Sequence, residues 1–174
     1  MSSEPLVAPH LVHVRIGQLA LGHSPMVLKA TLGSCVGIAL LWPDKALYAL
    51  AHCLLPYAPP QTGAALGGRY VDQAVCSMLR LLKAQDKDCA KIQAHVAGGA
   101  NMRRPDNPER SERPTRIAPH LAVGQLNIQA AEKVLSQQKI ALLSRDVGGF
   151  CARQIVLDCA QAQIKVLHVP TPTW

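Results

Sequence analysis

The sequence MVLKATLGSCVGIALLW occupies residues 26–42 and holds two apolar runs separated by a Gly-Ser break. Residues 26–32 and 36–42 each have the length and apolar character of a β-strand. A third apolar run covers residues 46–55, and the Pro43-Asp44 pair before it is typical of a turn. The pattern predicts a hairpin between residues 36–42 and 46–55, in which both outer ends return to one edge of a sheet.

The elements on either side follow from hydrophobic periodicity. Residues 11–16 alternate as a strand does, whereas residues 69–85 repeat apolar side chains every three or four positions, as an amphipathic helix does. A second helix is predicted for residues 125–137, and short strands are predicted for residues 91–97, 140–144, 154–157 and 163–169. Because strands outnumber helices and tight turns join several of them, we expect an α+β fold of layered, antiparallel-rich β-sheets covered by two main helices.

The length of 174 residues suits one domain, which we expect to cover residues 1–174 with a core at about 11–169. Residues 103–123 interrupt it with five arginines, three acidic residues and four prolines. This composition predicts a mobile surface loop.

Charge and composition narrow the possible functions. Lys and Arg total 18 against 11 for Asp and Glu, so the formal net charge is +7, which invites a nucleic-acid interpretation. Only 3% of the residues are aromatic, too few for a platform that stacks bases, so we expect no nucleic-acid partner. The N-terminus lacks a basic, apolar leader, and prolines interrupt the uncharged stretch 46–68, so we expect a cytoplasmic protein without membrane insertion.

The six cysteines form no CxxC pair, and the chain is too long to need disulfide bonds for stability. Cys53, Cys76 and Cys159 are interpreted as small buried thiols. His52 and Cys53 are adjacent on one predicted strand, so their side chains point to opposite faces and cannot share a metal ion. We therefore expect no metal site.

Cys35 and His52 are the candidates for chemistry, because the predicted hairpin brings them to the same edge. A free thiol has a pKa of about 8.5, so a neighbouring imidazole is needed to take its proton and generate the nucleophile. Backbone N–H groups at the Gly33-Ser34 break could stabilise an oxyanion. The alternatives are a small buried cysteine and a hydrogen-bonded histidine with no catalytic role.

Several sequence blocks together resemble one family. The strings LGSCVGIAL, AHCLLP, GRYVDQAV, VAGGANM and DVGG, with Arg153 downstream, are similar to the CheD family of chemoreceptor glutamine deamidases and span roughly residues 26–158. The resemblance implies the fold of the deamidating domain of cytotoxic necrotising factor toxins. It also implies that Cys35 is the nucleophile and His52 its base in converting receptor glutamines to glutamates, without a metal or organic cofactor. Some family members are also credited with hydrolysing receptor glutamyl methyl esters.

The chain departs from the family pattern at two places. The family's third catalytic residue is a threonine five or six positions before the cysteine, where this chain has Ala30 and Lys29, so Thr31 is taken as the third catalytic residue. After DVGG, Phe150 and Cys151 stand where the family often has Asn-Gly.

The resemblance names methyl-accepting chemotaxis receptors as the substrate and a CheC-type phosphatase as a second partner. The alternative function is a regulatory binding module with weak or no catalysis, which engages the receptors or that phosphatase. We expect a monomer, whose positive charge steers it toward an acidic receptor bundle.

Overall fold

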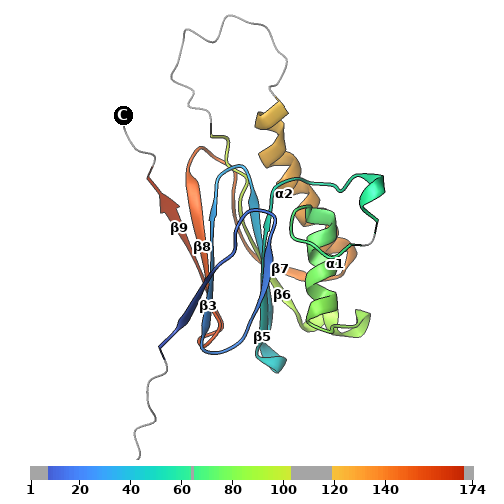
Figure 1. Ribbon diagram of the computed structural model, residues 1–174, viewed down its shortest axis with the longest axis vertical. Helices are drawn as coiled ribbons and strands as arrows, with labels where there is room; N and C mark the ends of the chain where they lie inside the picture. The colour runs from blue at the N-terminus through green and yellow to red at the C-terminus, as the bar shows by residue number, and fades with distance from the viewer. Residues whose placement is uncertain (1–7, 64, 103–118, 171–174) are drawn as a thin grey trace, which may run out of the picture.

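Two β-sheets lie face to face, and two helices cover the outer face of one of them (Figure 1). The computed structural model describes residues 8–63, 65–102 and 119–170, with the side chains of 119–122 left out. The four-stranded sheet has the order β1-β3-β8-β9, formed by β1 (His10–His13), β3 (Met26–Leu32), β8 (Ala152–Asp158) and β9 (Gln163–Val169). The five-stranded sheet has the order β2-β5-β4-β6-β7, formed by β2 (Leu19–Gly22), β5 (Leu47–Cys53), β4 (Val36–Trp42), β6 (Gln93–Gly98) and β7 (Ala141–Val147).

The helices pack on the face of the five-stranded sheet that points away from the other sheet (Figure 1). They are α1 (Val71–Leu81) and α2 (Pro119–Gln137), and three short 3₁₀ segments, Pro43–Lys45, Pro60–Thr62 and Asp86–Lys91, lie in the connections. Parallel pairing occurs between β1 and β3 and between β6 and β7, whereas the other strand pairs are antiparallel.

Strand β4 is buried on both faces because it lies in the middle of the sandwich. Val36, Ile38 and Leu40 pack toward the helices, whereas Ala39 and Leu41 pack between the two sheets. A continuous apolar run is what a strand with two covered faces requires, which explains why this segment lacks alternation. Two hydrophobic cores result, one under the helices and one between the sheets.

The α+β class and the covering by two helices are confirmed. The strands at 26–32 and 36–42 have the predicted bounds, and β4 and β5 form the predicted hairpin. The four-residue strand β2 was not predicted. It pairs with β5 at the edge of the five-stranded sheet and is too short to show a period.

Several predicted boundaries or environments are wrong. The first strand covers His10–His13 and not residues 11–16, and β7 extends to Val147 instead of ending at residue 144. Helix α1 ends at Leu81 rather than near residue 85, because Lys83 has a left-handed φ of 57°. Helix α2 begins at Pro119, so residues 119–123 are helical and not loop, while residues 103–118 lie outside the described residues. Cys76 is exposed because its helical neighbours Asp72 and Arg80 form the polar face of α1, whereas Cys53 and Cys159 are buried as predicted.

Across the described ranges, neither helix is long and apolar enough to cross a membrane.

Candidate active site at the junction of the two sheets

Cys35 lies where the chain passes from one sheet to the other. Strand β3 belongs to the four-stranded sheet and β4 to the five-stranded sheet, and only Gly33, Ser34 and Cys35 connect them. The Cys35 side chain packs in the core between the sheets with 6% of its surface exposed. The sequence break at Gly-Ser therefore marks a change of sheet.

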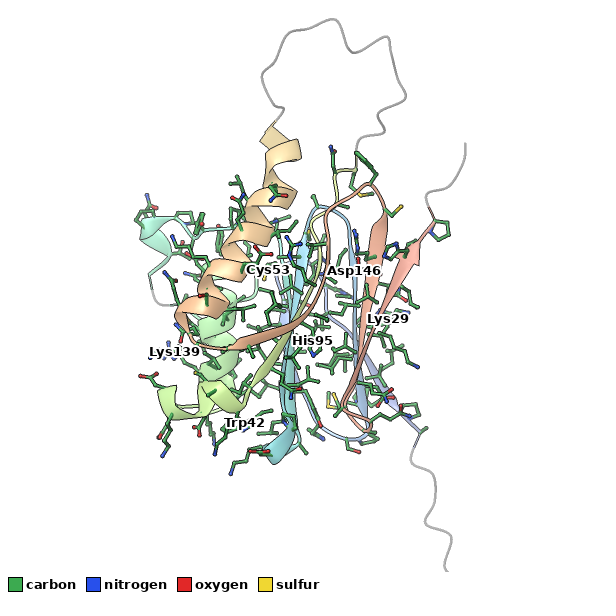
Figure 2. The ribbon with its side chains drawn as sticks, turned by 180° about the vertical axis from the view of Figure 1, so that it is seen from behind. Lys29, Trp42, Cys53, His95, Lys139 and Asp146 are labelled. Carbon is green, nitrogen blue, oxygen red and sulfur yellow. The ribbon has the colours of Figure 1, made fainter. Side chains whose placement is uncertain are left out.

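His52 faces the same layer from the neighbouring strand. Gly37 is the register partner of His52 across the β4–β5 pair, so Cys35, two residues before Gly37, is the diagonal neighbour of His52 on that face. Diagonal neighbours in antiparallel pairs are roughly 7–8 Å apart, within reach of long side chains. Cys53, the next residue, faces the helices, as predicted from strand alternation, and Figure 2 shows it on that side of the sheet.

The hydrogen bonds of His52 fix its tautomer. Its Nδ1 lies 3.1 Å from the backbone oxygen of Val14. Because a carbonyl oxygen only accepts, Nδ1 must carry the proton and Nε2 must present a lone pair. Nε2 is buried and has no hydrogen-bond partner among the described residues. Nε2 of His52 is therefore a free proton acceptor in the space between the two sheets, where Cys35 also lies.

Burial acts on the two groups in opposite directions. It raises the pKa of the Cys35 thiol, and the backbone N–H of the same residue only partly offsets this. It lowers the pKa of the His52 imidazole, against the smaller effect of the hydrogen bond to Val14. Both shifts disfavour a thiolate–imidazolium pair, so the two groups rest as a neutral thiol and a neutral base.

A second loop holds the Cys35 turn from the side of the five-stranded sheet. The N–H of Gly99 donates to the oxygen of Cys35 at 2.7 Å, and the N–H of Ala100 donates to the oxygen of Gly33 at 2.8 Å. A Cβ on Gly98 would stand 2.3 Å from the Cys35 oxygen. Gly98 and Gly99, which as a Gly-Gly pair predict only a tight turn, thus hold the Cys35 turn together with Ala100. We call residues 98–100 the clamp, and a side chain on either glycine would collide with its neighbours.

The same turn leaves backbone donors available. Within the described part of the chain, no carbonyl oxygen accepts from the N–H groups of Ser34 or Cys35. Unpaired N–H groups beside a nucleophile are what an oxyanion hole requires. The Gly-Ser break thus leaves two N–H groups without a carbonyl partner among the described residues, and their use as an oxyanion hole stays a prediction.

Thr31 lies on the other face of its strand. Leu28, Ala30 and Leu32 of β3 point into the core between the sheets, whereas Thr31 is exposed and its Oγ1 accepts a hydrogen bond from Nε2 of Gln154 at 3.2 Å. Lys29 shares that outer face by strand alternation, and Figure 2 shows it on the four-stranded sheet, away from the helices.

Thr31 and His52 line the same surface hollow, which has a volume of about 430 Å³. Thr31, Lys29 and His52 all line it, together with residues 13–16, while Cys35 is not among the lining residues. His52 thus faces the space between the two sheets, where Cys35 lies, and also lines the hollow that Thr31 lines. Thr31 and Cys35 themselves do not lie on one face.

Comparison with known proteins gives a consistent result. The family described as CheD chemotactic sensory transduction matches residues 54–168, more than half of the chain. A probable chemoreceptor glutamine deamidase CheD 2 from Ruegeria is 34% identical, over 91% of this chain and 92% of that protein. The chain belongs to the CheD family.

Two further relatives carry related names. A probable chemoreceptor glutamine deamidase CheD from Bdellovibrio bacteriovorus is 39% identical, over 79% of this chain and 81% of its own. The chemoreceptor glutamine deamidase CheD of Thermotoga maritima is 28% identical, over 90% of each chain. The resemblance proposed from the sequence blocks is thereby confirmed.

The DVGG segment, one of those CheD-like blocks, is organised by a buried arginine. Arg153 donates from Nε to Asp146 Oδ1 at 2.7 Å, and from one terminal nitrogen to the oxygens of Gly148 and Cys151. Burial alone would raise the pKa of Asp146, but hydrogen bonds from Arg153 and His168 bring it below its usual range. Figure 2 shows Asp146 on the side of the four-stranded sheet, away from the helices.

This turn is joined to the clamp. The N–H of Gly148 donates to the oxygen of Gly98, and the N–H of Asn101 donates to the oxygen of Gly149. Arg153 therefore acts on the site indirectly, by ordering the loop against which the clamp rests. Phe150 and Cys151, the departures from the CheD pattern, are both exposed beside it.

Sequence reasoning missed one polar residue of this CheD-like site. Asn127 of α2 is fully buried and bonds to the backbone of the turn that holds Cys35. The signal was present, since an asparagine stands on the apolar face that Ile128, Ala131 and Val134 define. No group of three His, Cys, Asp or Glu side chains in the described ranges is placed to hold a metal ion.

Proposed function

We propose that this chain hydrolyses glutamine side chains of chemoreceptors to glutamates, with release of ammonia. The observation that carries the proposal is the neutral His52, whose one available nitrogen is buried in the same layer as the Cys35 thiol. The names of the CheD relatives, which act on chemoreceptor glutamines, supply the substrate.

Because both groups rest neutral, the proton moves during attack and not before it. Sγ of Cys35 bonds to the carboxamide carbon while its proton passes to Nε2 of His52. The tetrahedral intermediate collapses, the C–N bond breaks, and the amine takes that proton and leaves as ammonia. A water molecule then gives a proton to Nε2 and attacks the thioester, which releases glutamate and restores the thiol.

The negative charge that develops on the substrate oxygen needs donors fixed in advance. The N–H groups of Ser34 and Cys35 meet this requirement, because their turn is held by the hydrogen bonds from Gly99 and Ala100. Removal of one such donor from an oxyanion hole typically lowers kcat by about 10²–10³-fold.

Thr31 is proposed as the third residue, in substrate binding. Its Oγ1 accepts from Gln154, which leaves the hydroxyl proton free to donate into the hollow that His52 also lines. Since Thr31 and Cys35 lie on different faces, Thr31→Val is expected to raise KM and leave kcat close to that of the wild type.

The direct test is mass spectrometry of a receptor cytoplasmic fragment incubated with the protein. Conversion of an amide to an acid adds about one mass unit at the modified glutamine. Cys35→Ala and His52→Gln are expected to abolish this gain while the circular dichroism spectrum is kept. Full activity of Cys35→Ala would disprove the assignment.

Cys53→Ala is the matched control, because it removes a buried thiol one residue from His52 that faces the helices instead. It is expected to lower stability and keep deamidation. Loss of activity in Cys53→Ala as well would show that the assay reports folding only.

A second candidate function is binding of a partner without turnover. It is favoured by the low exposure of Cys35 and by two exposed apolar side chains near its turn, Met102 and Phe150 at 50% and 53% exposure. A pull-down with Cys35→Ala against a CheC-type phosphatase tests it. Binding combined with an inactive wild type would favour this function over the first.

We further propose that the protein works as a monomer in the cytoplasm, where the receptor's helical bundle is accessible. Light scattering of the purified chain tests the first statement, and fractionation of cells expressing it tests the second. A stable dimer or a membrane-bound fraction would contradict them.

A further inference from the structure

Helix α2 carries an asparagine that bonds to both segments of the candidate site. The side-chain nitrogen of Asn127 donates to the oxygen of Ser34 at 3.2 Å and to the oxygen of Leu54 at 3.1 Å. Ser34 directly precedes Cys35, and Leu54 follows His52 by two residues. Both partners are carbonyl oxygens, so only the NH₂ end of the amide can face them.

The hydrogen bond to Ser34 also fixes the N–H of Cys35. A trans peptide is planar, so its C=O and N–H point in opposite directions. Holding the Ser34 oxygen against Asn127 therefore turns the Cys35 N–H away from α2. That N–H has no carbonyl partner among the described residues, and it is the backbone group that opposes the rise in thiol pKa that burial causes.

Close backbone packing brings α2 near enough for this contact. A Cβ on Gly124 would stand 2.6 Å from the oxygen of Gly99, and a Cβ on Gly99 would stand 2.9 Å from the oxygen of Gly124. Gly124 is three residues before Asn127 and therefore on the same side of the helix. Glycine at both positions places the amide over the Cys35 turn.

Stability alone does not account for an asparagine here. The residue is fully buried, and its Oδ1 has no partner among the described residues. A buried polar atom without a hydrogen bond is destabilising, and asparagine is a weak helix former. Only the amide nitrogen of Asn127 makes hydrogen bonds, and these reach the Cys35 turn and the end of β5.

We propose that Asn127 is a positioning residue of the deamidation, which holds the Cys35 turn and the strand end that carries His52 at a fixed separation. The inference rests on the proposed function for its catalytic consequence. It acts through the backbone and does not touch substrate.

Asn127→Leu tests this, because it keeps the number and branching of the side-chain heavy atoms and removes both hydrogen bonds. Since a displacement of about 1 Å can cost about 10²-fold in rate, kcat is expected to fall by about that factor while KM changes little. The pH midpoint of Cys35 alkylation by iodoacetamide, followed on the Cys35 peptide by mass spectrometry, is expected to move upward, because the Cys35 N–H is no longer fixed in the orientation in which it lowers the thiol pKa.

The control is Ser77→Ala, which removes another buried hydrogen bond, from the N–H of Gly67 to Oγ, in helix α1. It is expected to lower Tm without changing kcat or the alkylation midpoint. If Asn127→Leu behaves in the same way, Asn127 is structural only and the proposal is overturned.

Two safeguards keep the outcome decisive. If Asn127→Leu does not fold, Asn127→Asp is used instead, because it keeps the shape of the side chain. Its carboxyl loses the one proton it can donate as the pH rises, so its activity is expected to fall further at higher pH. A pH profile like that of the wild type would overturn the proposal. If the wild type shows no deamidation, the proposed function fails, and the alkylation midpoints alone decide whether Asn127 positions Cys35.

Discussion

Replacing Gly98 with alanine is expected to damage the site more than the fold. The new Cβ would stand 2.3 Å from the Cys35 oxygen, whereas ordinary contact begins near 3.4 Å, so that oxygen must move by about 1.1 Å (3.4 − 2.3). Gly98 has a φ of 103°, where a residue with a side chain is strained by about 1–3 kcal/mol. The bond from Gly99 to the Cys35 oxygen adds about 1 kcal/mol when it is weakened.

The free energy of unfolding should therefore fall by about 2–4 kcal/mol. For a domain of this length each kcal/mol corresponds to about 2–4 °C, so Tm should fall by about 4–16 °C. A displacement of about 1 Å next to the nucleophile should lower kcat by about 10²-fold at a temperature where the variant remains folded. Calorimetry gives Tm, and mass spectrometry of the receptor fragment gives the rate.

Gly63→Ala is the matched control. Gly63 also has a positive φ, 60°, but a Cβ there would meet nothing within 4 Å. It is expected to share the backbone strain, with a fall in Tm of a few degrees, and to keep full activity. A folded Gly98→Ala variant that deamidates as fast as Gly63→Ala would refute the reasoning that the clamp sets the Cys35 geometry.

Three further outcomes follow from burial and charge. Burial lowers the pKa of His52, so the imidazole stays neutral below the usual value of 6.5. The acid limb of the kcat/KM profile should therefore have its midpoint below pH 6.5. Initial rates across the acid range measure this midpoint, and a value above pH 6.5 would contradict the prediction. Arg153→Met leaves the carbonyl oxygens of Gly148 and Cys151 without their donor, whereas the Asp146 carboxylate, 37% exposed, keeps His168 and water as partners. Urea unfolding should therefore show a loss of about 1–3 kcal/mol, and an unchanged free energy of unfolding would contradict this. A thiol reagent should label the exposed Cys76 and Cys151 within the native protein, whereas Cys159, whose pKa burial raises to about 11, should react only after unfolding; early labelling of Cys159 would contradict its burial.

Local sequence signals predicted the elements that chain breakers delimit. The bounds of β3 and β4 follow from apolar runs ended by Gly33-Ser34 and Pro43-Asp44, and the β4–β5 hairpin follows from the same turn. The geometry of this hairpin was enough to predict that Cys35 lies near His52, and the observed strand pairing puts them two residues apart in register. The strand β2 could not be found this way, because its four residues are strand only through pairing with β5.

The division into two sheets was beyond local signals. Nothing in the sequence around Gly33 and Ser34 says that the strands on either side join different sheets, because that depends on the distant partners β8 and β6. Asn127 was missed for a related reason: it serves backbone atoms 93 and 73 residues away. The mistaken environment of Cys76 was avoidable, since its i±4 neighbours are charged.

The candidate base depends on both sheets, because His52 belongs to the five-stranded sheet and its hydrogen-bond partner follows a strand of the other. The sulfur lies on the crossover, and the carbonyl that orients His52 belongs to Val14, which follows the edge strand of the opposite sheet. No single rigid layer contains both the base and the group that sets its tautomer. If Cys35 and His52 act as proposed, a shift of one sheet against the other is expected to alter turnover before it unfolds the protein, so the proposed chemistry depends on the apolar packing around Leu28 and Leu157.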